Sequence, residues 1–141
     1  MNEQFPDFFL RGLSNKDFVC DGLVLQSAFQ FDDCKRDDNM HEASINWLDD
    51  SRAIDIALSQ RKENGKLQFQ AGVAKLDLNM VKLFLAAIQN STFTYERAAI
   101  DGNPYHGNLL IHGNTPKQIK GLIANGLALA AGTNIIPQTN T

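Results

Sequence analysis

Two strand-like runs flank a turn-forming sequence near residue 100, and this pattern constrains the fold more than any other feature of the chain. Residues 92–100 include Thr, Phe, Tyr and Ile, which favour strands. Residues 105–112 form the second run, and the Asp-Gly-Asn-Pro sequence at 101–104 is typical of a tight turn. The pattern predicts a β-hairpin and, with it, an antiparallel sheet.

The run 105–112 has a polar and an apolar face, because successive side chains of a strand point to opposite sides. The two sets are His106, Asn108 and His112 against Tyr105, Leu109 and Ile111. In an extended strand the two histidine rings stand about 20 Å apart, at ~3.3 Å per residue. They cannot act on one bond unless the chain bends at Gly107, so His106, beside the turn, is the better candidate for a functional residue.

Further alternating patterns predict strands at 8–13, 23–31, 41–48 and 66–76. In the 41–48 run, Ser44 and Asn46 share the polar face. The charged residues 32–39 are expected to form an exposed loop.

Helical spacing of apolar residues predicts helices at 51–62, 78–89 and 115–131, although 78–89 is also compatible with a buried strand. The last helix is the best defined, with Thr115-Pro116 at its start and Gly132 at its end. Gly121 and Gly126 lie inside it, and each costs on the order of 1 kcal/mol relative to alanine. This cost suggests that the helix backbone approaches the sheet closely.

These elements predict one α+β domain over residues 1–132: a mostly antiparallel sheet of about six strands packed by two or three helices, followed by a polar tail at 133–141. A length of 141 residues fits one domain with a sizeable core. A helix that packs on one face of the sheet leaves the other face available for a site.

Composition narrows the functional classes. The formal net charge is −3, which argues against nucleic acid as a partner. The N-terminal sequence does not resemble a signal peptide, and no apolar run is long enough to span a bilayer, so we expect a cytoplasmic protein without membrane contact. Cys20 and Cys34 match no zinc pattern and are expected as unpaired thiols. No metal or other cofactor is predicted.

Arg11, His106 and His41 are the candidate catalytic residues. An arginine in an apolar strand needs a carboxylate, phosphate or substrate partner, unless the strand is an edge and the side chain faces water. Histidine is the side chain best suited to proton transfer near neutral pH. The candidate binding residues are polar side chains of the predicted strands and turn: Asn103, Asn108, Ser44 and Asn46.

Two functions remain open. The first is an accessory protein that binds a partner protein or self-associates. The second is a small enzyme that acts on a nucleotide or nucleic acid, with His106 as acid or base and Arg11 as a phosphate clamp. The first is favoured, because the chain has neither a Gly-rich phosphate loop nor a Gly-x-Ser-x-Gly motif. The second gains support if Arg11 and His106 converge with His41 or Glu42.

Five short stretches occur in an order that resembles a group of small uncharacterised bacterial proteins: Phe9-Leu10-Arg11-Gly12-Leu13, Ser27-Ala28-Phe29, Ala43-Ser44-Ile45-Asn46-Trp47-Leu48, Gly72-Val73-Ala74 and Asn103-Pro104-Tyr105-His106. This resemblance implies a role in a bacterial defence, toxin–antitoxin or immunity system. The Arg-Gly strand is also similar to the opening of ADP-ribosyltransferase folds. The chain departs from those folds because Glu96 stands alone, without a Glu-x-Glu motif.

Overall fold

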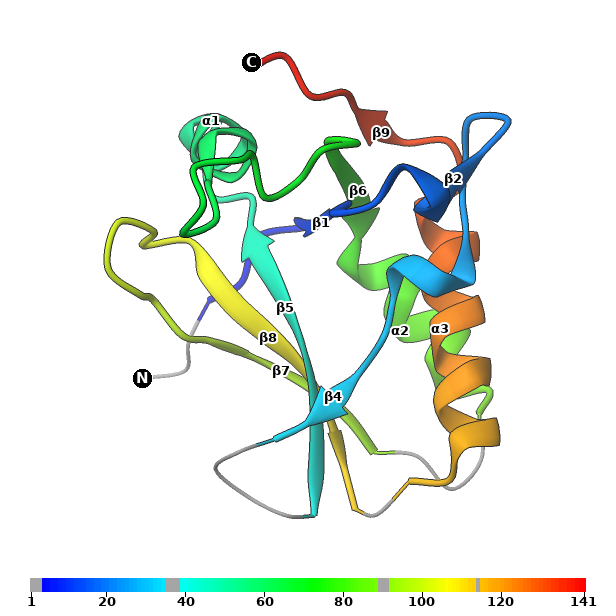
Figure 1. The fold of residues 1–141 in the computed structure, drawn as a ribbon. Helices are drawn as coiled ribbons and strands as arrows, with labels where there is room; N and C mark the ends of the chain where they lie inside the picture. Colours follow the sequence, from blue (N-terminus) through cyan, green and yellow to red (C-terminus); the bar gives the residue numbers. More distant parts are fainter. Residues whose placement is uncertain (1–3, 35–38, 89–91, 114) are drawn as a thin grey trace.

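The computed structural model describes residues 4–34, 39–88, 92–113 and 115–141, which form a single α+β domain around a curled antiparallel sheet (Figure 1). In the described residues the strands of this sheet are β1 (Phe8–Gly12), β4 (Asp32–Asp33), β5 (Met40–Trp47), β6 (Val73–Asp77), β7 (Thr92–Arg97), β8 (His106–His112) and β9 (Ile135–Ile136). Their order is β7-β8-β5-β1-β6-β9, and β4 pairs with β5. The predicted fold class is confirmed.

The helices are α1 (Arg52–Ser59), α2 (Leu78–Ala86) and α3 (Lys117–Ala131), with short 3-10 turns η1 (Lys16–Phe18) and η2 (Gln26–Ala28). Strands β2 (Val19–Cys20) and β3 (Leu23–Val24) form a separate two-stranded ribbon. In the part of the chain that the structure describes, no helix has the length and apolar character needed to cross a membrane.

The predicted hairpin is present as β7 and β8, which pair in an antiparallel register that places Tyr95 beside Leu109. On its other side β8 pairs with β5, where Asn46 lies beside His106 and Ser44 beside Asn108. Paired residues of neighbouring strands point to the same face, so the polar side chains of β5 and β8 share one face, as the alternation predicts.

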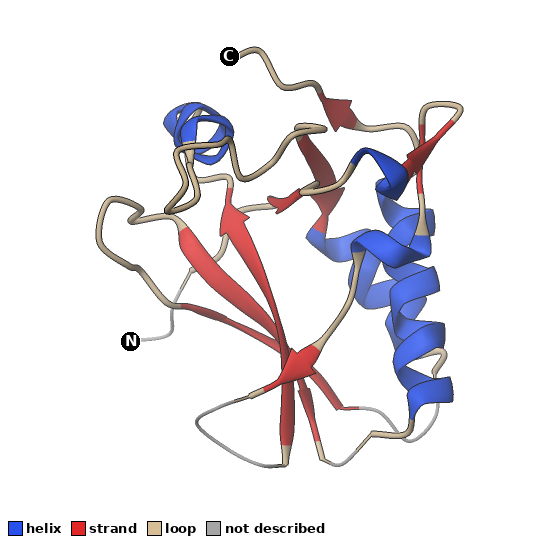
Figure 2. Ribbon diagram, viewed as in Figure 1, coloured by secondary structure: helices blue, strands red, loops and turns tan. Residues whose placement is uncertain are grey.

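Helices α2 and α3 pack together on the opposite face and cover the main core (Figure 2). This core contains the side chains of Phe9, Trp47, Leu109 and Ile111, all inaccessible to solvent. Gly126 of α3 allows the close helix contact, because an added Cβ would lie 3.2 Å from Leu85 Cδ2. The α3 backbone therefore makes the expected close approach at Gly126, but it approaches α2 rather than the sheet.

The second face of the sheet is only partly open. Helix α1 lies against it and covers a smaller core that includes Leu10, Val73 and Tyr105. Burial of Ala53 and Ala57, on one side of α1, fixes the helix there. Of the polar side chains on this face of β5 and β8, Ser44 is exposed and His106 is partly buried, whereas Asn46 and Asn108 are buried.

Two strand predictions are wrong. Residues 23–31 contain β3 and η2 instead of one strand. Phe29 and Phe31 enter the core as expected, but Leu23 and Leu25, which the alternation places on the same face, are exposed. In the 66–76 run only the end is a strand, because Gly72 has φ +96°, a conformation that turns the chain. Phe69, three residues before Gly72, folds back against Gly12.

Other elements differ in extent. Helix α1 ends at Ser59, before the predicted end at residue 62, and Pro116 rather than Thr115 occupies the N-cap of α3. The predicted loop at 32–39 begins with β4, while residues 35–38 lie outside the described residues. In the expected polar tail, Ile135 and Ile136 pair with β6, and Gln138 Nε2 donates hydrogen bonds to the carbonyls of Leu58 and Phe69, both at 2.9 Å.

Candidate functional site

The sheet has a gap beside the middle of β5. Strand β1 pairs with β5 through Asn46 and Trp47, whereas β4 pairs with it through His41 and Glu42. Between Glu42 and Asn46, no strand of the described residues lies on this side of β5. Backbone carbonyls that lose their strand partner need another donor.

Arg11, at the end of β1, supplies that donor. Its Nη1 donates to the Ser44 carbonyl at 2.7 Å, and its Nε donates to the Ala28 carbonyl at 2.9 Å. A longer bond of 3.5 Å joins Nη2 to the Gln30 carbonyl. The guanidinium therefore ties β5 to the segment that follows η2. β1 is an interior strand, so the expectation of an edge strand with Arg11 facing water is wrong. Within the described residues the hydrogen-bond acceptors of Arg11 are backbone carbonyls.

Burial of the Arg11 guanidinium lowers its pKa below the ordinary value, and the carboxylate of Asp32 opposes this shift. An arginine keeps its proton in proteins at neutral pH. The site therefore holds a permanent positive charge, which the carbonyl dipoles and the nearby carboxylate of Asp32 balance in part.

A pocket of about 290 Å³ opens at this gap. Its lining comes from β1 and η1, from β5 and β8, and from loops near residues 60, 68 and 100. The lining residues are Arg11, Gly12, Ser14, Phe18, Ser44, Ile45, Asn46, Gln60, Gln68, Phe69, Ile100 and His106. Four of the predicted site residues thus meet in one pocket: Arg11, Ser44, Asn46 and His106. We call this the gap pocket.

His106 enters the gap pocket with a defined tautomer. Its Nδ1 lies 2.8 Å from the Ala98 carbonyl, an acceptor, so Nδ1 carries the proton and donates. In the neutral ring Nε2 then holds the lone pair. The hairpin positions the ring, because Ala98 follows β7 and His106 begins β8. His112 ends β8, where its Nε2 lies 2.7 Å from Thr94 Oγ1, so the two rings stand at opposite ends of the strand.

Asn46 is buried beside His106, and its Oδ1 accepts a hydrogen bond of 2.6 Å from Asn103 Nδ2. Asn103 in turn accepts the backbone N–H of Tyr105 at 3.1 Å. Asn103 therefore shapes the turn and orients Asn46, and it does not line the pocket.

The structure does not bring the other candidates to the gap pocket. His41 lies near the opposite end of β5, beside Ile111, where its Nε2 accepts the Thr115 backbone N–H at 3.3 Å. The His41 Nδ1 is 3.0 Å from Asp33 Oδ1, but the two atoms are not oriented for a hydrogen bond. Asn108 donates to Glu96 Oε1 at 3.0 Å and stays outside the pocket.

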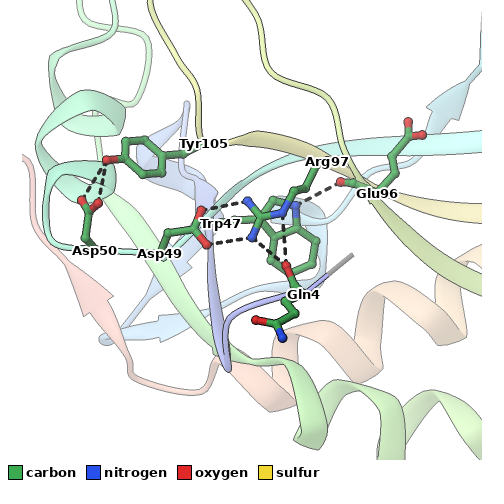
Figure 3. Close-up of polar contacts among 7 residues, drawn as sticks. All are labelled: Gln4, Trp47, Asp49, Asp50, Glu96, Arg97 and Tyr105. Carbon is green, nitrogen blue, oxygen red and sulfur yellow. Dashed lines mark hydrogen bonds and ion pairs between the residues drawn. The ribbon is translucent and has the colours of Figure 1, made fainter. Parts of the chain in front are cut away.

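Sequence reasoning missed Gln60, Gln68 and Ser14, which lie in loops on the pocket rim. A strand pattern can indicate which side chains share a face, but it does not locate loop residues. Sequence reasoning also missed a polar network at the end of β5 (Figure 3). Arg97 binds both carboxylate oxygens of Asp49 at 2.8 and 2.9 Å and also donates to the Gln4 carbonyl.

The second part of this network joins Tyr105 to Asp50. The Tyr105 hydroxyl lies 2.8 and 2.9 Å from the two carboxylate oxygens of Asp50. This hydrogen bond is the main reason that the pKa of Asp50 lies below its ordinary 3.8, and burial raises the pKa of Tyr105 above 10. Asp50 also accepts the Arg52 backbone N–H at the start of α1, so the network anchors α1 near the pocket.

Cys20 is exposed and Cys34 buried, and both are free thiols. Within the described ranges, no group of three or more His, Cys, Asp and Glu residues is placed to hold a metal ion. Comparison of the chain with protein-family models, with curated proteins and with solved structures finds no match. The resemblances seen in the sequence therefore stay predictions.

Proposed function

We propose that the gap pocket binds a small molecule that carries a carboxylate or phosphate group. The observation that supports this most directly is the position of Arg11, a permanent cation that lines the pocket beside His106. The described lining of the pocket contains no aspartate or glutamate. An anionic group is the ligand chemistry that such a lining complements.

Arg11 has donors to spare. A guanidinium carries five N–H groups, and the bonds to Ala28, Ser44 and Gln30 use one each. The remaining N–H groups have no acceptor among the described residues, so an anion in the pocket would supply one, and the carbonyl bonds hold the side chain in place beforehand. A donor held in position loses little conformational entropy when the ligand arrives.

The other lining residues define the rest of the ligand. The carboxamides of Gln60 and Gln68 and the hydroxyls of Ser14 and Ser44 offer both donors and acceptors. Phe18 and Phe69 add apolar walls. A volume of about 290 Å³ lies near the lower end of ligand pockets, about 300–1,000 Å³. The pocket therefore suits a compact polar molecule rather than a large cofactor.

The test is a thermal melt with inorganic phosphate, pyrophosphate or AMP, each compared with sodium chloride at equal ionic strength. A probe at a hundred times its Kd stabilises the fold by about 2.7 kcal/mol, which raises the Tm on the order of 10 °C for a domain of this size. If none of the three probes raises the Tm above the chloride control, the proposal is wrong.

Gln68→Glu locates the effect. Gln68 is exposed on the rim, so its replacement by glutamate leaves the fold intact but places a negative charge at the pocket, and binding should fall about tenfold. The matched control is Gln70→Glu, which makes the same change at an exposed position outside the pocket. Equal loss of binding in both variants would place the anion elsewhere.

A catalytic role is a second candidate, and the hydrogen bond between His106 and Ala98 favours it. That bond leaves Nε2 able to accept a proton from water or from a ligand hydroxyl. His106→Ala should abolish phosphate release from AMP or from a model phosphodiester and change the Tm little, because the ring is only half buried. If the wild-type protein releases no phosphate, the catalytic role is wrong and only the binding function remains. Binding to a partner protein, the function favoured by the sequence, concerns another surface.

A further inference from the structure

A groove larger than the gap pocket lies between α3 and the segment that leads from η2 towards β4, and its volume is about 1,010 Å³. One wall consists of the first half of α3, from Lys117 to Ala124, and the other of residues 26–31. Phe18 lines both the groove and the gap pocket. We call this hollow the α3 groove.

The charged side chains among the described lining of the α3 groove are both positive. Lys117 and Lys120 line it, and within the described residues neither makes a salt bridge. None of the lining residues that the structure describes is acidic. The positive end of the α3 dipole lies at the same place, because α3 begins at Lys117. The charge of the groove is therefore opposite to the net charge of the chain, which is −3.

The groove rim carries unused amide groups. Gln26, Gln30 and Gln118 are exposed there, and the described structure shows no hydrogen bond from any of the three carboxamides. Each carboxamide is both donor and acceptor, so the three together can pair with N–H and C=O groups of an extended polypeptide, which must all be satisfied when it is bound.

The floor is apolar and the helical wall is low. Phe29 and Phe31 lie below the groove with most of their surface in the core. At Gly121 the α3 backbone lies open to the groove, because glycine has no side chain. Packing does not require glycine there, since an added Cβ would lie 3.5 Å from Gln26 Nε2, an ordinary contact. Gly121 thus costs helix stability on the order of 1 kcal/mol without a packing reason, and its effect is to keep the groove open.

Arg11 stabilises the opposite wall. Its bonds to the carbonyls of Ala28 and Gln30 fix the segment 26–31 in the free protein. A preformed groove avoids part of the entropic cost of ordering on binding.

We propose that the α3 groove binds an extended acidic segment of a partner protein, with an apolar side chain on the phenylalanine floor and carboxylates at Lys117 and Lys120. The rim glutamines pair with the backbone of the segment. The charge complementarity of the groove selects this occupant over a second copy of the chain, since the chain itself is acidic overall.

The experiment uses the full chain and fluorescence anisotropy with labelled peptides in which one Leu or Phe stands among Asp and Glu residues. Basic counterparts have Lys and Arg in place of the acids. The acidic set should bind, the basic set should not, and added salt should weaken binding because exposed charges are screened. Lys117→Glu with Lys120→Glu should reduce the affinity about tenfold or more.

Two further variants separate the groove from general charge effects. Lys62→Glu with Lys66→Glu makes the same change in net charge at exposed positions outside the groove, and it should retain affinity within about twofold. Gly121→Leu fills the groove while replacing glycine by a better helix former, so peptide binding should be lost with no fall in Tm.

Several outcomes overturn the proposal. These are equal binding of acidic and basic peptides, full affinity in the Lys117→Glu/Lys120→Glu protein, and equal loss in the Lys62→Glu/Lys66→Glu control. A labelled uridine oligomer is included in the same assay. If it binds the groove and the acidic peptides do not, the lysines are phosphate contacts and the partner is a nucleic acid rather than a protein.

Discussion

Gly107→Ala is a severe test of how the core and the hairpin fit together. Gly107 lies in β8 between Trp47 of β5 and the carbonyl of Glu96 on β7. The indole Nε1 of Trp47 donates to that carbonyl at 3.0 Å, across Gly107. An alanine Cβ would overlap both atoms of this hydrogen bond and would lie 2.8 Å from Trp47 Cδ1.

The size of the effect follows from what must move. Trp47 is fully buried, and the Glu96 oxygen belongs to the backbone, so neither can withdraw without disturbing the core. Overpacking costs about 1–3 kcal/mol. A buried donor that loses its acceptor costs about another 1–3 kcal/mol. The expected loss in the free energy of unfolding is therefore about 2–6 kcal/mol, a large part of the 5–15 kcal/mol typical of a whole domain.

The assay is urea unfolding followed by the fluorescence of Trp47, the only tryptophan of the chain. The reporter is thus the residue that the substitution displaces, and circular dichroism gives an independent measure of the transition. The control is Gly121→Ala, in a helix with room for the methyl group, which should raise stability by up to about 1 kcal/mol. A Gly107→Ala midpoint equal to that of wild type would refute the described packing of Trp47 over Gly107.

Two further predictions concern polar groups. Arg11→Met should lower the free energy of unfolding by about 2–4 kcal/mol in urea titrations, because it removes the donors of the Ala28 and Ser44 carbonyls. Arg11→Lys should restore only part of this stability, since an ammonium lacks the guanidinium fork. Wild-type stability in either protein would contradict the structural role of Arg11. Tyr105→Phe should lower the Tm at neutral pH by removing the hydrogen bond that depresses the pKa of Asp50. A carboxyl group whose pKa is depressed by folding contributes stability at pH values above its unfolded pKa near 3.8, and this contribution is lost as the pH falls through the folded pKa. The Tm difference between the two proteins should therefore shrink in acid. A Tm difference that stays constant down to the lowest pH at which both proteins fold would exclude this linkage.

Alternation along single strands was sufficient to predict part of the site. The even-numbered positions of β5 and β8 share a face, which puts Asn46 beside His106. The hairpin itself follows from the Asp-Gly-Asn-Pro turn, whose Gly102 has φ +77°. These features are local, so a pattern of a few residues carries them.

The features that escaped prediction depend on tertiary structure. The role of Arg11 arises because β1 and β4 share one side of β5 and leave the Ser44 carbonyl between them without a strand partner, a condition that no local pattern encodes. Residues 66–72 alternate as a strand does, but the positive φ of Gly72 and the packing of Phe69 on Gly12 override that tendency. His41 was expected to be a catalytic residue, whereas it is buried and hydrogen-bonded to the loop before α3.

The position of β1 in the middle of the sheet has a consequence for how the chain folds. Its two neighbours, β5 and β6, begin only at Met40 and Val73, so both of its pairings close long loops. Such non-local pairing slows folding, typically to milliseconds or seconds. Until β6 arrives, one edge of the apolar Phe8-Phe9-Leu10 sequence stays unpaired and available to other chains. Refolding should therefore become less efficient as protein concentration rises, with aggregation starting from the first strand of the sequence.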